Sequence, residues 1–236
     1  MIPAAGTLRA ITLDLDDTLW PVLPTLVAAE ARLEAWLAEH APQTARRCAR
    51  PVLRDMRLAL LEAHPERAHD MNWLRHEGLR RAIVGCGEDP ALADAAFEVF
   101  LAARQQVTLY PDVRPVLARW ASRWRLVAVT NGNADVSRVG LADLFSACIS
   151  AHEIGVAKPD ARMFEAACEA GGATPQTTLH VGDDIELDVG GARRAGLHAA
   201  WLRRADLHNA STRRLIEAGT ETAWDSLSAI DEALGA

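Results

Sequence analysis

Three acidic residues near the start of the chain, Asp14, Asp16 and Asp17, could act together on a substrate or a metal ion. They stand at the end of a short apolar run, residues 10–15, that indicates a buried strand. Side chains two residues apart in a strand point the same way, so we expect Asp14 and Asp16 to face one site. Two close carboxylates repel each other unless a cation lies between them or one of them holds a proton. Taken alone, the cluster is equally compatible with an acidic turn in which Asp16 or Asp17 caps the next element.

A second set of residues could bind an anion. Thr130, Asn131 and Gly132 end another apolar run, and they combine a hydroxyl group with a turn whose backbone N–H groups can surround an anion. Lys158 lies just before the expected start of a helix at residue 160. A single lysine of this kind is usually a solvated surface charge, so a functional role for Lys158 depends on the residues that surround it.

Three further acids, Asp183, Asp184 and Asp188, stand at or soon after the end of the apolar run 178–182. Considered in isolation, Asp183 and Asp184 are ordinary helix-capping residues. The carboxyl ends of neighbouring parallel strands, however, line the crevice in which α/β proteins bind their ligands. If the apolar runs are parallel strands, these acids therefore belong to the same site as the first cluster.

The apolar runs alternate with helical patterns along most of the chain. Besides residues 10–15, strand-like runs lie at 125–130, 147–150, 178–182 and 198–203, and helical patterns lie at 137–144, 160–170 and 188–195. Strands that alternate with helices predict parallel β-α-β units. We therefore expect an α/β fold with a Rossmann-like, doubly wound parallel sheet, and a closing helix at 226–234.

Residues 21–110 break this alternation. They contain no convincing strand and instead predict four helices, one with an apolar face between residues 26 and 40 and another at about 44–63, started or kinked by Pro51. Asp70 is the expected N-cap of the third helix, and Asp89-Pro90 is expected to open the fourth. The sequence thus predicts an all-helical domain at 21–110, inserted into a core made of 1–20 and 111–236.

The composition excludes several classes of function. Half of the 236 residues are hydrophobic and 24% are charged, as in a folded chain, and a net charge of −7 disfavours nucleic-acid binding. No stretch approaches the roughly 20 apolar residues that cross a bilayer, so we expect no membrane association and a cytoplasmic location. The scattered cysteines predict free thiols: Cys48, Cys86, Cys148 and Cys168.

The acid clusters, the threonine turn and the lysine resemble, in order, the four motifs of the haloacid dehalogenase-like hydrolases. These are DLDDT at 14–18, TN at 130–131, KP at 158–159 and GDD at 182–184 with a later acid. The resemblance covers essentially the whole chain, and a chance match to all four motifs at successive strand ends is improbable. It implies a helical cap domain of the C1 type inserted after the first strand.

The resemblance also implies chemical roles. Asp14 is the expected nucleophile, which forms an aspartyl-phosphate, and Asp16 the expected general acid and base. The family places Mg²⁺ on the carboxylates of Asp14 and Asp183 and on the backbone carbonyl of Asp16, an all-oxygen set that suits this ion. Asp184 and Asp188 are expected beside these ligands rather than on the metal, and Asp184 stands where many relatives carry Ser or Thr.

The remaining motif residues are expected to handle the phosphoryl group. Thr130 and the backbone of the Asn131-Gly132 turn would bind its oxygens, while Lys158 would offset charge around Asp14. Asp16 separates two reaction types within the family, because dehalogenases lack an acid at this position and halide needs no proton to leave. The resemblance thus implies a hydrolase of phosphoric monoesters. Asp17 replaces a commoner glycine, and we expect no loss of activity from it.

A narrower resemblance concerns the substrate. VTNGNAD, HVGDD, DVGGARRAG and a cap segment with His69, Asp70 and Arg75 look like a bacterial subgroup of flavin-pathway phosphatases. Its members act on 5-amino-6-(5-phospho-D-ribitylamino)uracil and flavin mononucleotide, which would place the chain in riboflavin biosynthesis. His69 and Arg75 are then candidate substrate-binding residues, although a capped surface helix explains them equally well.

Other interpretations use the same residues. A broad-specificity phosphatase of sugar phosphates, nucleotides or phosphoglycolate needs the same catalytic set. A non-catalytic binding protein of this fold should lack at least one key residue, and no gap is found here. In each case the expected partner is a small phosphate ester, and the chain is expected to be a monomer or a homodimer.

Overall fold

The computed structural model describes residues 2–204 and 222–235. The chain divides into two compact units, which we call the core unit (Met1–Pro21 and Thr108–Ala236) and the helical unit (Val22–Val107). The domain boundaries expected from the sequence differ from these divisions by one residue at the first crossing and three at the second. In the part of the chain that the structure describes, no helix is long and apolar enough to span a membrane.

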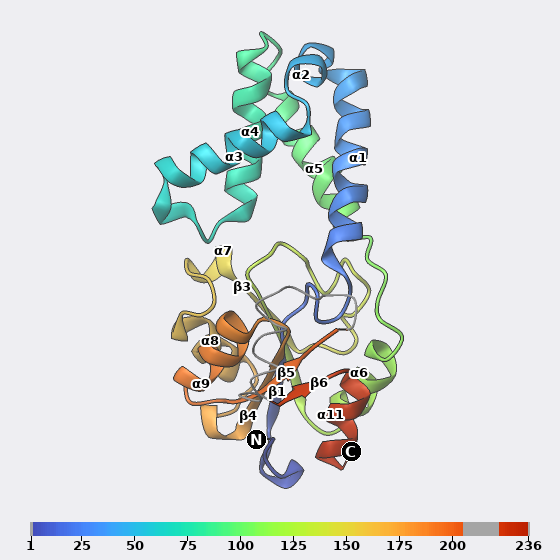
Figure 1. Cartoon of the computed structure of the whole chain (residues 1–236), viewed down its shortest axis with the longest axis vertical. Coiled ribbons are helices and arrows are strands. Elements are labelled where there is room, and N and C mark those ends of the chain that lie inside the picture. The colour runs from blue at the N-terminus through green and yellow to red at the C-terminus, as the bar shows by residue number, and fades with distance from the viewer. Residues whose placement is uncertain (1, 205–221, 236) are drawn as a thin grey trace. The chain divides into compact units, whose positions relative to one another are not determined.

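The described residues of the core unit form one parallel sheet of six strands (Figure 1). The spatial order is β3-β2-β1-β4-β5-β6, that of a Rossmann-like fold, and every neighbouring pair is parallel. The strands are β1 (Ala10–Leu13), β2 (Arg125–Thr130), β3 (Ala147–Ser150), β4 (Thr178–Gly182), β5 (His198–Leu202) and β6 (Ala223–Trp224). The expected doubly wound α/β sheet is therefore confirmed.

The order of the strands indicates where a ligand site should lie in the core unit. From β1 the chain builds outward through β2 and β3 in one direction, and from β4 outward through β5 and β6 in the other. The two central strands are in register, with Leu13 opposite Val181, so the residues that follow β1 and β4 emerge side by side. This point of reversal is where open α/β sheets bind ligands.

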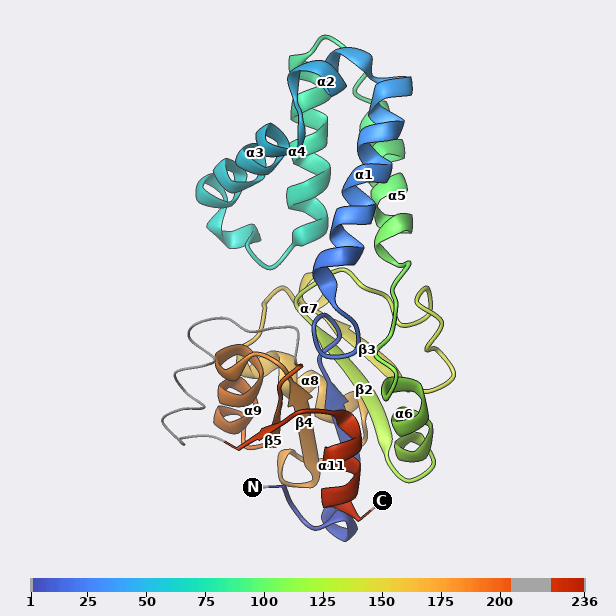
Figure 2. The same ribbon diagram turned by 45° about the vertical axis from the view of Figure 1, so that its right-hand side comes forward.

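Helices cover both faces of the sheet (Figure 2). One face carries α8 (Ala161–Ala170) and α9 (Gly191–Arg194), and their apolar residues pack on β2 and β5 around Phe164. The other face carries α6 (Val113–Ala121) and α11 (Leu227–Leu234), which are joined where the buried Trp120 indole donates to Asp231. Among the described residues of the core unit, the remaining helical elements are α7 (Ala151–Ile154), the π-helix η4 (Ile185–Gly190) and the 3-10 turns η1 (Ala5–Thr7) and η3 (Pro175–Thr177).

Two helix expectations in the core unit need correction. Residues 137–144 form successive turns rather than a helix, because Gly140 adopts a left-handed conformation (φ 80°) inside the pattern. The helix expected at 188–195 begins earlier, at Ile185, and its first turn is a wide π-helix. The closing helix is confirmed as α11, and Ser226 caps it by accepting from the Ala229 N–H.

The helical unit contains, within residues 22–107, five α-helices. They are α1 (Val22–His40), α2 (Pro42–Arg47), α3 (Arg50–Ala63), α4 (Met71–Gly85) and α5 (Leu92–Arg104), with the 3-10 turn η2 (Pro65–Arg67) before α4. Its own apolar core, built mainly by α1, α4 and α5, includes Leu33, Leu37 and Phe100. The unit therefore has the apolar interior that a separate folding unit requires.

The helical unit has one more helix than the sequence predicts. The segment expected as a single helix at 44–63 is divided at Cys48 and Ala49, and Pro51 lies in the first turn of α3, where its missing N–H costs nothing. Asp70 caps α4 as expected, accepting from the Trp73 N–H at 2.9 Å. Asp89 instead caps a turn, since it accepts from the Ala91 N–H and α5 begins at Leu92.

Candidate active site

Asp14 lies directly after β1, where its N–H donates to the Val181 carbonyl of the neighbouring strand. Its carboxylate is buried, and the Lys158 ammonium group donates to its Oδ1 at 2.5 Å. The same ammonium group donates to Asp188 Oδ1 at 2.6 Å. The lysine that could have been a surface charge is therefore buried between two acids, one of them the expected nucleophile.

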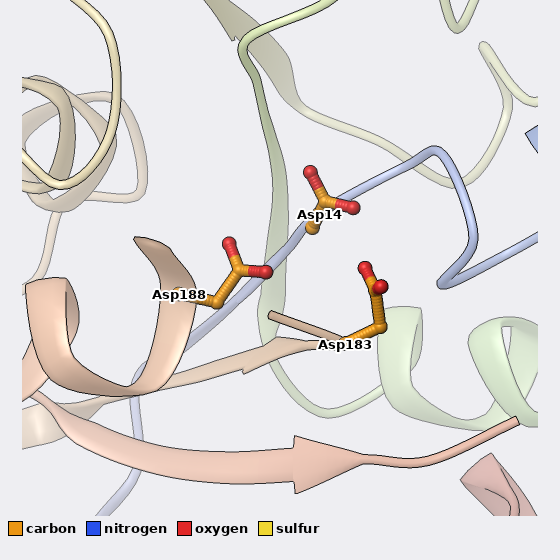
Figure 3. Close-up of side chains that lie close together, drawn as sticks. All are labelled: Asp14, Asp183 and Asp188. Carbon is orange, nitrogen blue, oxygen red and sulfur yellow. The ribbon is translucent and has the colours of Figure 1, made fainter. Parts of the chain in front are cut away.

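The carboxylates of Asp14, Asp183 and Asp188 each place an oxygen within 4.8 Å of the others (Figure 3). Asp183 follows β4, and Asp188 lies on the π-helix η4. Two contacts fix Asp183: the Thr18 hydroxyl donates to its Oδ1 at 3.2 Å, and the Trp201 indole donates to its backbone carbonyl at 2.9 Å. The structure thus brings together three acids separated by up to 174 positions in the chain.

Burial and mutual repulsion disfavour full ionisation of these three acids. Burial, reinforced by Asp188 and only partly opposed by Lys158, raises the pKa of Asp14 to about 7. Burial and the charge of Asp14 raise the pKa of Asp183 to about 9. Buried carboxylate oxygens that repel one another are the donors a hard divalent cation prefers, so these residues fit Mg²⁺.

Asp188 differs from the other two acids because protein donors already occupy both of its oxygens. Lys158 and the His180 ring donate to Oδ1, at 2.6 and 3.1 Å, and the Asp184 N–H donates to Oδ2 at 3.1 Å. Burial alone would raise the pKa of Asp188, but Lys158 and His180 outweigh it and lower the pKa below its usual range. This arrangement favours Asp188 as the anchor of Lys158 rather than as a metal ligand.

Burial lowers the pKa of Lys158, but the charges of Asp14 and Asp188 outweigh this effect and raise it above its ordinary value. The ammonium group therefore stays protonated. The side-chain amide of Asn131 makes two hydrogen bonds to the backbone of Lys158. Its oxygen accepts from the Lys158 N–H at 2.7 Å, and its nitrogen donates to the Lys158 carbonyl at 3.1 Å. Asn131, expected to act through its backbone, thus also positions the lysine.

The other predicted residues have defined places. Thr130, at the end of β2, is buried, and its hydroxyl accepts from the Gly132 N–H at 2.9 Å, which closes the turn. The carboxylate of Asp184 accepts from the N–H groups of Glu186 and Leu187, so it caps η4. Asp184 therefore has a capping role, the alternative that the sequence left open for it.

Asp16 lies in the loop after β1, where the Trp20 indole donates to its Oδ1 at 2.8 Å. The next residue, Asp17, adopts a left-handed conformation with φ 58°. Glycine adopts this conformation most readily and aspartate tolerates it, which explains why either residue can stand there.

Comparisons with known proteins agree with this geometry. Residues 8–196 match the family model for haloacid dehalogenase-like hydrolases. The chain belongs to this family. The match includes all four motifs and the whole helical unit, so the family assigned from the motifs is confirmed.

Individual relatives of this haloacid dehalogenase-like hydrolase have different reported activities. The 5-amino-6-(5-phospho-D-ribitylamino)uracil phosphatase YigB of Escherichia coli K12 is 35% identical over 202 residues, 84% of each chain. A glyceraldehyde 3-phosphate phosphatase of Methanopyrus kandleri is 29% identical over 209 residues, also 84% of each chain. A solved structure of a 2-haloacid dehalogenase from Pseudomonas syringae pv. Tomato DC3000 is 37% identical, with a TM-score of 0.86 over 97% of this chain and 98% of the other.

The two residues predicted to select the substrate lie in the helical unit. His69 is in the turn before α4 and is half-buried. The Arg75 side chain is 11% exposed; it donates to Glu30 at 2.8 Å and stacks on Phe100 at 3.4 Å from the ring centre. Burial and the nearby Arg57 lower the pKa of Arg75 to about 10. These contacts hold the Arg75 side chain within the helical unit of this hydrolase, and the substrate-binding role of His69 and Arg75 stays a prediction.

Sequence reasoning missed several residues that support the site. The His180 ring bonds to Asp188 and, at 2.8 Å, to the Thr12 hydroxyl, so a buried chain of contacts runs from β1 to Lys158. One signal was present, because His180 is a polar residue inside the otherwise apolar run 178–182. Trp20 and Trp201 gave no such signal, since a tryptophan in an apolar pattern indicates only the core.

Arg204, at the end of β5, joins the two places where the chain passes between the units. It donates to the Thr18 carbonyl at 3.0 Å and to both carboxylate oxygens of Asp112, and it stacks on Tyr110. The Tyr110 N–H donates in turn to the Leu19 carbonyl at 3.0 Å. The first and second crossings are thus held side by side within the core unit.

Proposed function

We propose that this hydrolase is a Mg²⁺-dependent phosphatase that hydrolyses a small phosphate monoester through an aspartyl-phosphate on Asp14. The observation that carries the proposal is the buried contact of 2.5 Å between Lys158 and Asp14, beside the carboxylate of Asp183. An ammonium group at this position neutralises charge on the nucleophile and on an incoming phosphoryl group. The named phosphatases among the relatives support the same reaction class.

The reaction proceeds in two displacements at phosphorus. A carboxylate oxygen of Asp14 attacks, the bond from phosphorus to the leaving oxygen breaks, and the proton of Asp16 moves to that oxygen. The Asp16 carboxylate then takes a proton from water as the water oxygen attacks the phosphoryl group, and the bond to Asp14 breaks. Free phosphate leaves, and both acids return to their starting states.

The metal and the phosphoryl group use separate donors. The carboxylates of Asp14 and Asp183 and the backbone carbonyl of Asp16 would hold Mg²⁺, which neutralises charge on the transferred group when bound. The Thr130 hydroxyl and the backbone N–H groups of Asn131 and Gly132 would bind phosphoryl oxygens. Asp188, held by His180, would keep Lys158 in place as charge develops.

The substrate we propose first is 5-amino-6-(5-phospho-D-ribitylamino)uracil, with flavin mononucleotide as a related ester. The similarity to the Escherichia coli enzyme of that name, 35% over 84% of both chains, supports this choice. A broad-specificity phosphatase of sugar phosphates, nucleotides or phosphoglycolate is the alternative, because the same catalytic residues would serve for any of these esters.

A second candidate function is hydrolytic dehalogenation of a 2-haloacid. The solved structure of that name, 37% identical with a TM-score of 0.86, favours it. Asp16 argues against it, since a halide leaves without a proton and a carboxylic acid at this position serves an oxygen leaving group. We therefore rank dehalogenation second.

One panel of substrates tests both candidates. The enzyme, with Mg²⁺ and with a chelator, is offered the ribitylamino-uracil phosphate, flavin mononucleotide, sugar phosphates, p-nitrophenyl phosphate and 2-chloropropionate, and free phosphate and chloride are measured. We expect metal-dependent phosphate release that is lost in Asp14→Asn. Chloride release without phosphate release would overturn the proposal in favour of the dehalogenase, and neither product would overturn both.

A further inference from the structure

Trp20 is fully buried, and its indole N–H donates to Asp16 Oδ1 at 2.8 Å. An indole N–H can only donate, and a buried one is normally bonded. The carboxylate that receives this bond is the one proposed to move protons during catalysis. The contact therefore joins a core residue to a catalytic group.

The loop that contains both residues is closed on itself. The Asp17 N–H donates to the Trp20 carbonyl at 2.8 Å, and Asp16 and Trp20 form an isolated bridge. The Leu19 N–H donates to the Leu15 carbonyl at 2.8 Å. These backbone contacts fix the position of Trp20 relative to Asp16. Burial restricts the orientation of the indole ring.

We propose that Trp20 is a positioning residue for Asp16, and this inference rests on the phosphatase function proposed above. Because the indole donates in every state, Oδ1 of Asp16 stays an acceptor whether the carboxyl group is ionised or protonated. The transferable proton then lies on Oδ2. The bond therefore selects the oxygen that delivers the proton and holds the carboxyl plane in one orientation.

In the first displacement, the proton on Oδ2 moves to the leaving oxygen as its bond to phosphorus breaks, which leaves Asp16 ionised and Asp14 phosphorylated. An alkyl alcohol requires this proton, because an alkoxide is a poor leaving group. A nitrophenol leaves readily as its anion and needs the proton far less. A defect in the position of Asp16 must therefore affect alkyl esters more than nitrophenyl esters.

The test is kcat/KM of Trp20→Phe for an alkyl phosphate and for p-nitrophenyl phosphate, since in a two-step mechanism kcat/KM reports only the first displacement. We expect a fall of about tenfold for the alkyl ester, the effect of losing one hydrogen bond to a charged group. For the nitrophenyl ester we expect a fall of no more than about threefold. An equal fall for both esters, or no fall for either, would overturn the proposal.

Trp120→Phe is the matched control. Trp120 is also fully buried, and its indole donates to a carboxylate oxygen, Asp231 Oδ1, over the same 2.8 Å. It joins α6 to α11, and the carboxylate that accepts its bond is not one of the proposed catalytic acids. We expect this variant to lower the melting temperature and to leave the ratio of the two kcat/KM values unchanged.

Two further variants separate the possible failures. Asp16→Asn should show a larger split between the two esters than Trp20→Phe, and if it shows none, the acid role in the proposed function fails first. If Asp16→Asn shows the split and Trp20→Phe does not, only the role of Trp20 fails. Should Trp20→Phe not fold, replacing Trp20 by 3-benzothienylalanine removes the N–H and keeps the ring shape, and the same tenfold criterion applies.

Discussion

At the scale of residues, the site is a buried cluster in which carboxylates outnumber the ammonium group that pairs with them. Lys158 donates hydrogen bonds to Asp14 and Asp188. Asp183 lies beside them and accepts a hydrogen bond from the Thr18 hydroxyl. Such a cluster holds protons that solvent-exposed acids would release at neutral pH, because burial and mutual repulsion both disfavour the ionised forms. Binding of a cation should therefore be linked to release of protons.

Titration of the enzyme with Mg²⁺ by calorimetry measures this linkage. The pKa values of Asp14 and Asp183 are raised to about 7 and about 9, so at pH 7 both groups are protonated to a substantial extent. Mg²⁺ binds the ionised forms, so we expect between about one and two protons to be released per ion at pH 7 and affinity to rise from pH 6 to pH 9. The proton count follows from repeating the titration in buffers of different ionisation enthalpy. Affinity that is independent of pH, with no proton release, contradicts the raised values.

At the scale of elements, the site depends on how closely the π-helix η4 approaches the end of β4. Gly182 is the last residue of that strand, and a Cβ atom there would overlap the carboxyl group of Asp188. Since Asp188 anchors Lys158, we expect a small change in the strand to reach Asp14, the proposed nucleophile, through two contacts.

Gly182→Ala tests this coupling. Overpacking of a buried position costs about 1–3 kcal/mol, so the free energy of unfolding should fall by that amount. Displacement of Asp188 should also move Lys158, and we expect kcat to fall by at least about a hundredfold, as for other misplaced catalytic groups.

Gly6→Ala is the control for that substitution, because a Cβ atom at Gly6 meets no atom within 4 Å. Its stability should stay within about 0.5 kcal/mol of the wild type, with unchanged turnover. Full activity in Gly182→Ala would show that Asp188 does not have to lie where the structure places it.

At the scale of the whole molecule, the chain leaves the core unit and returns to it at adjacent points. The Leu19 carbonyl accepts from the Tyr110 N–H, and Arg204 holds the segments on both sides. Apart from His69 and Arg75, every residue predicted to act in the site belongs to the core unit. The helical unit, with its separate apolar core, is then expected to influence substrate choice rather than the chemistry.

Excision of the helical unit tests this division. Joining Pro21 to Thr108 through a short Gly-Ser linker bridges a gap that the Leu19–Tyr110 contact keeps small. We expect a protein that unfolds cooperatively, still binds Mg²⁺ and still hydrolyses p-nitrophenyl phosphate, but has lost its preference among metabolites. A folded core that binds no Mg²⁺ would mean that the helical unit supplies part of the metal site.

Local patterns in the sequence predicted much of this structure. Short apolar runs gave β1 to β5 because buried parallel strands need such runs, but β6 has only two residues and leaves no pattern. Residues 137–144 form turns rather than the expected helix because of the left-handed Gly140, and the helix expected at 44–63 is divided at Cys48 and Ala49. Motif residues are found from sequence because their types and order are specific.

The supporting residues could not be predicted in this way. Trp201 contacts Asp183, and Arg204 contacts Thr18 across 186 positions, and no periodic pattern encodes such distant pairs. The pairing of Arg75 with Glu30, 45 positions away, is a contact of the same kind. Side-chain partners depend on the tertiary fold, which local patterns do not contain.

The central claim is that Asp14 carries the phosphoryl group. The direct measurement is to quench the enzyme during turnover of its best phosphate ester, reduce it with borohydride and map the products by peptide mass spectrometry. Borohydride converts an aspartyl-phosphate to homoserine, so we expect homoserine at position 14 in the wild type and none in Asp14→Asn. Homoserine at a different aspartate, or full turnover by Asp14→Asn, would contradict the account.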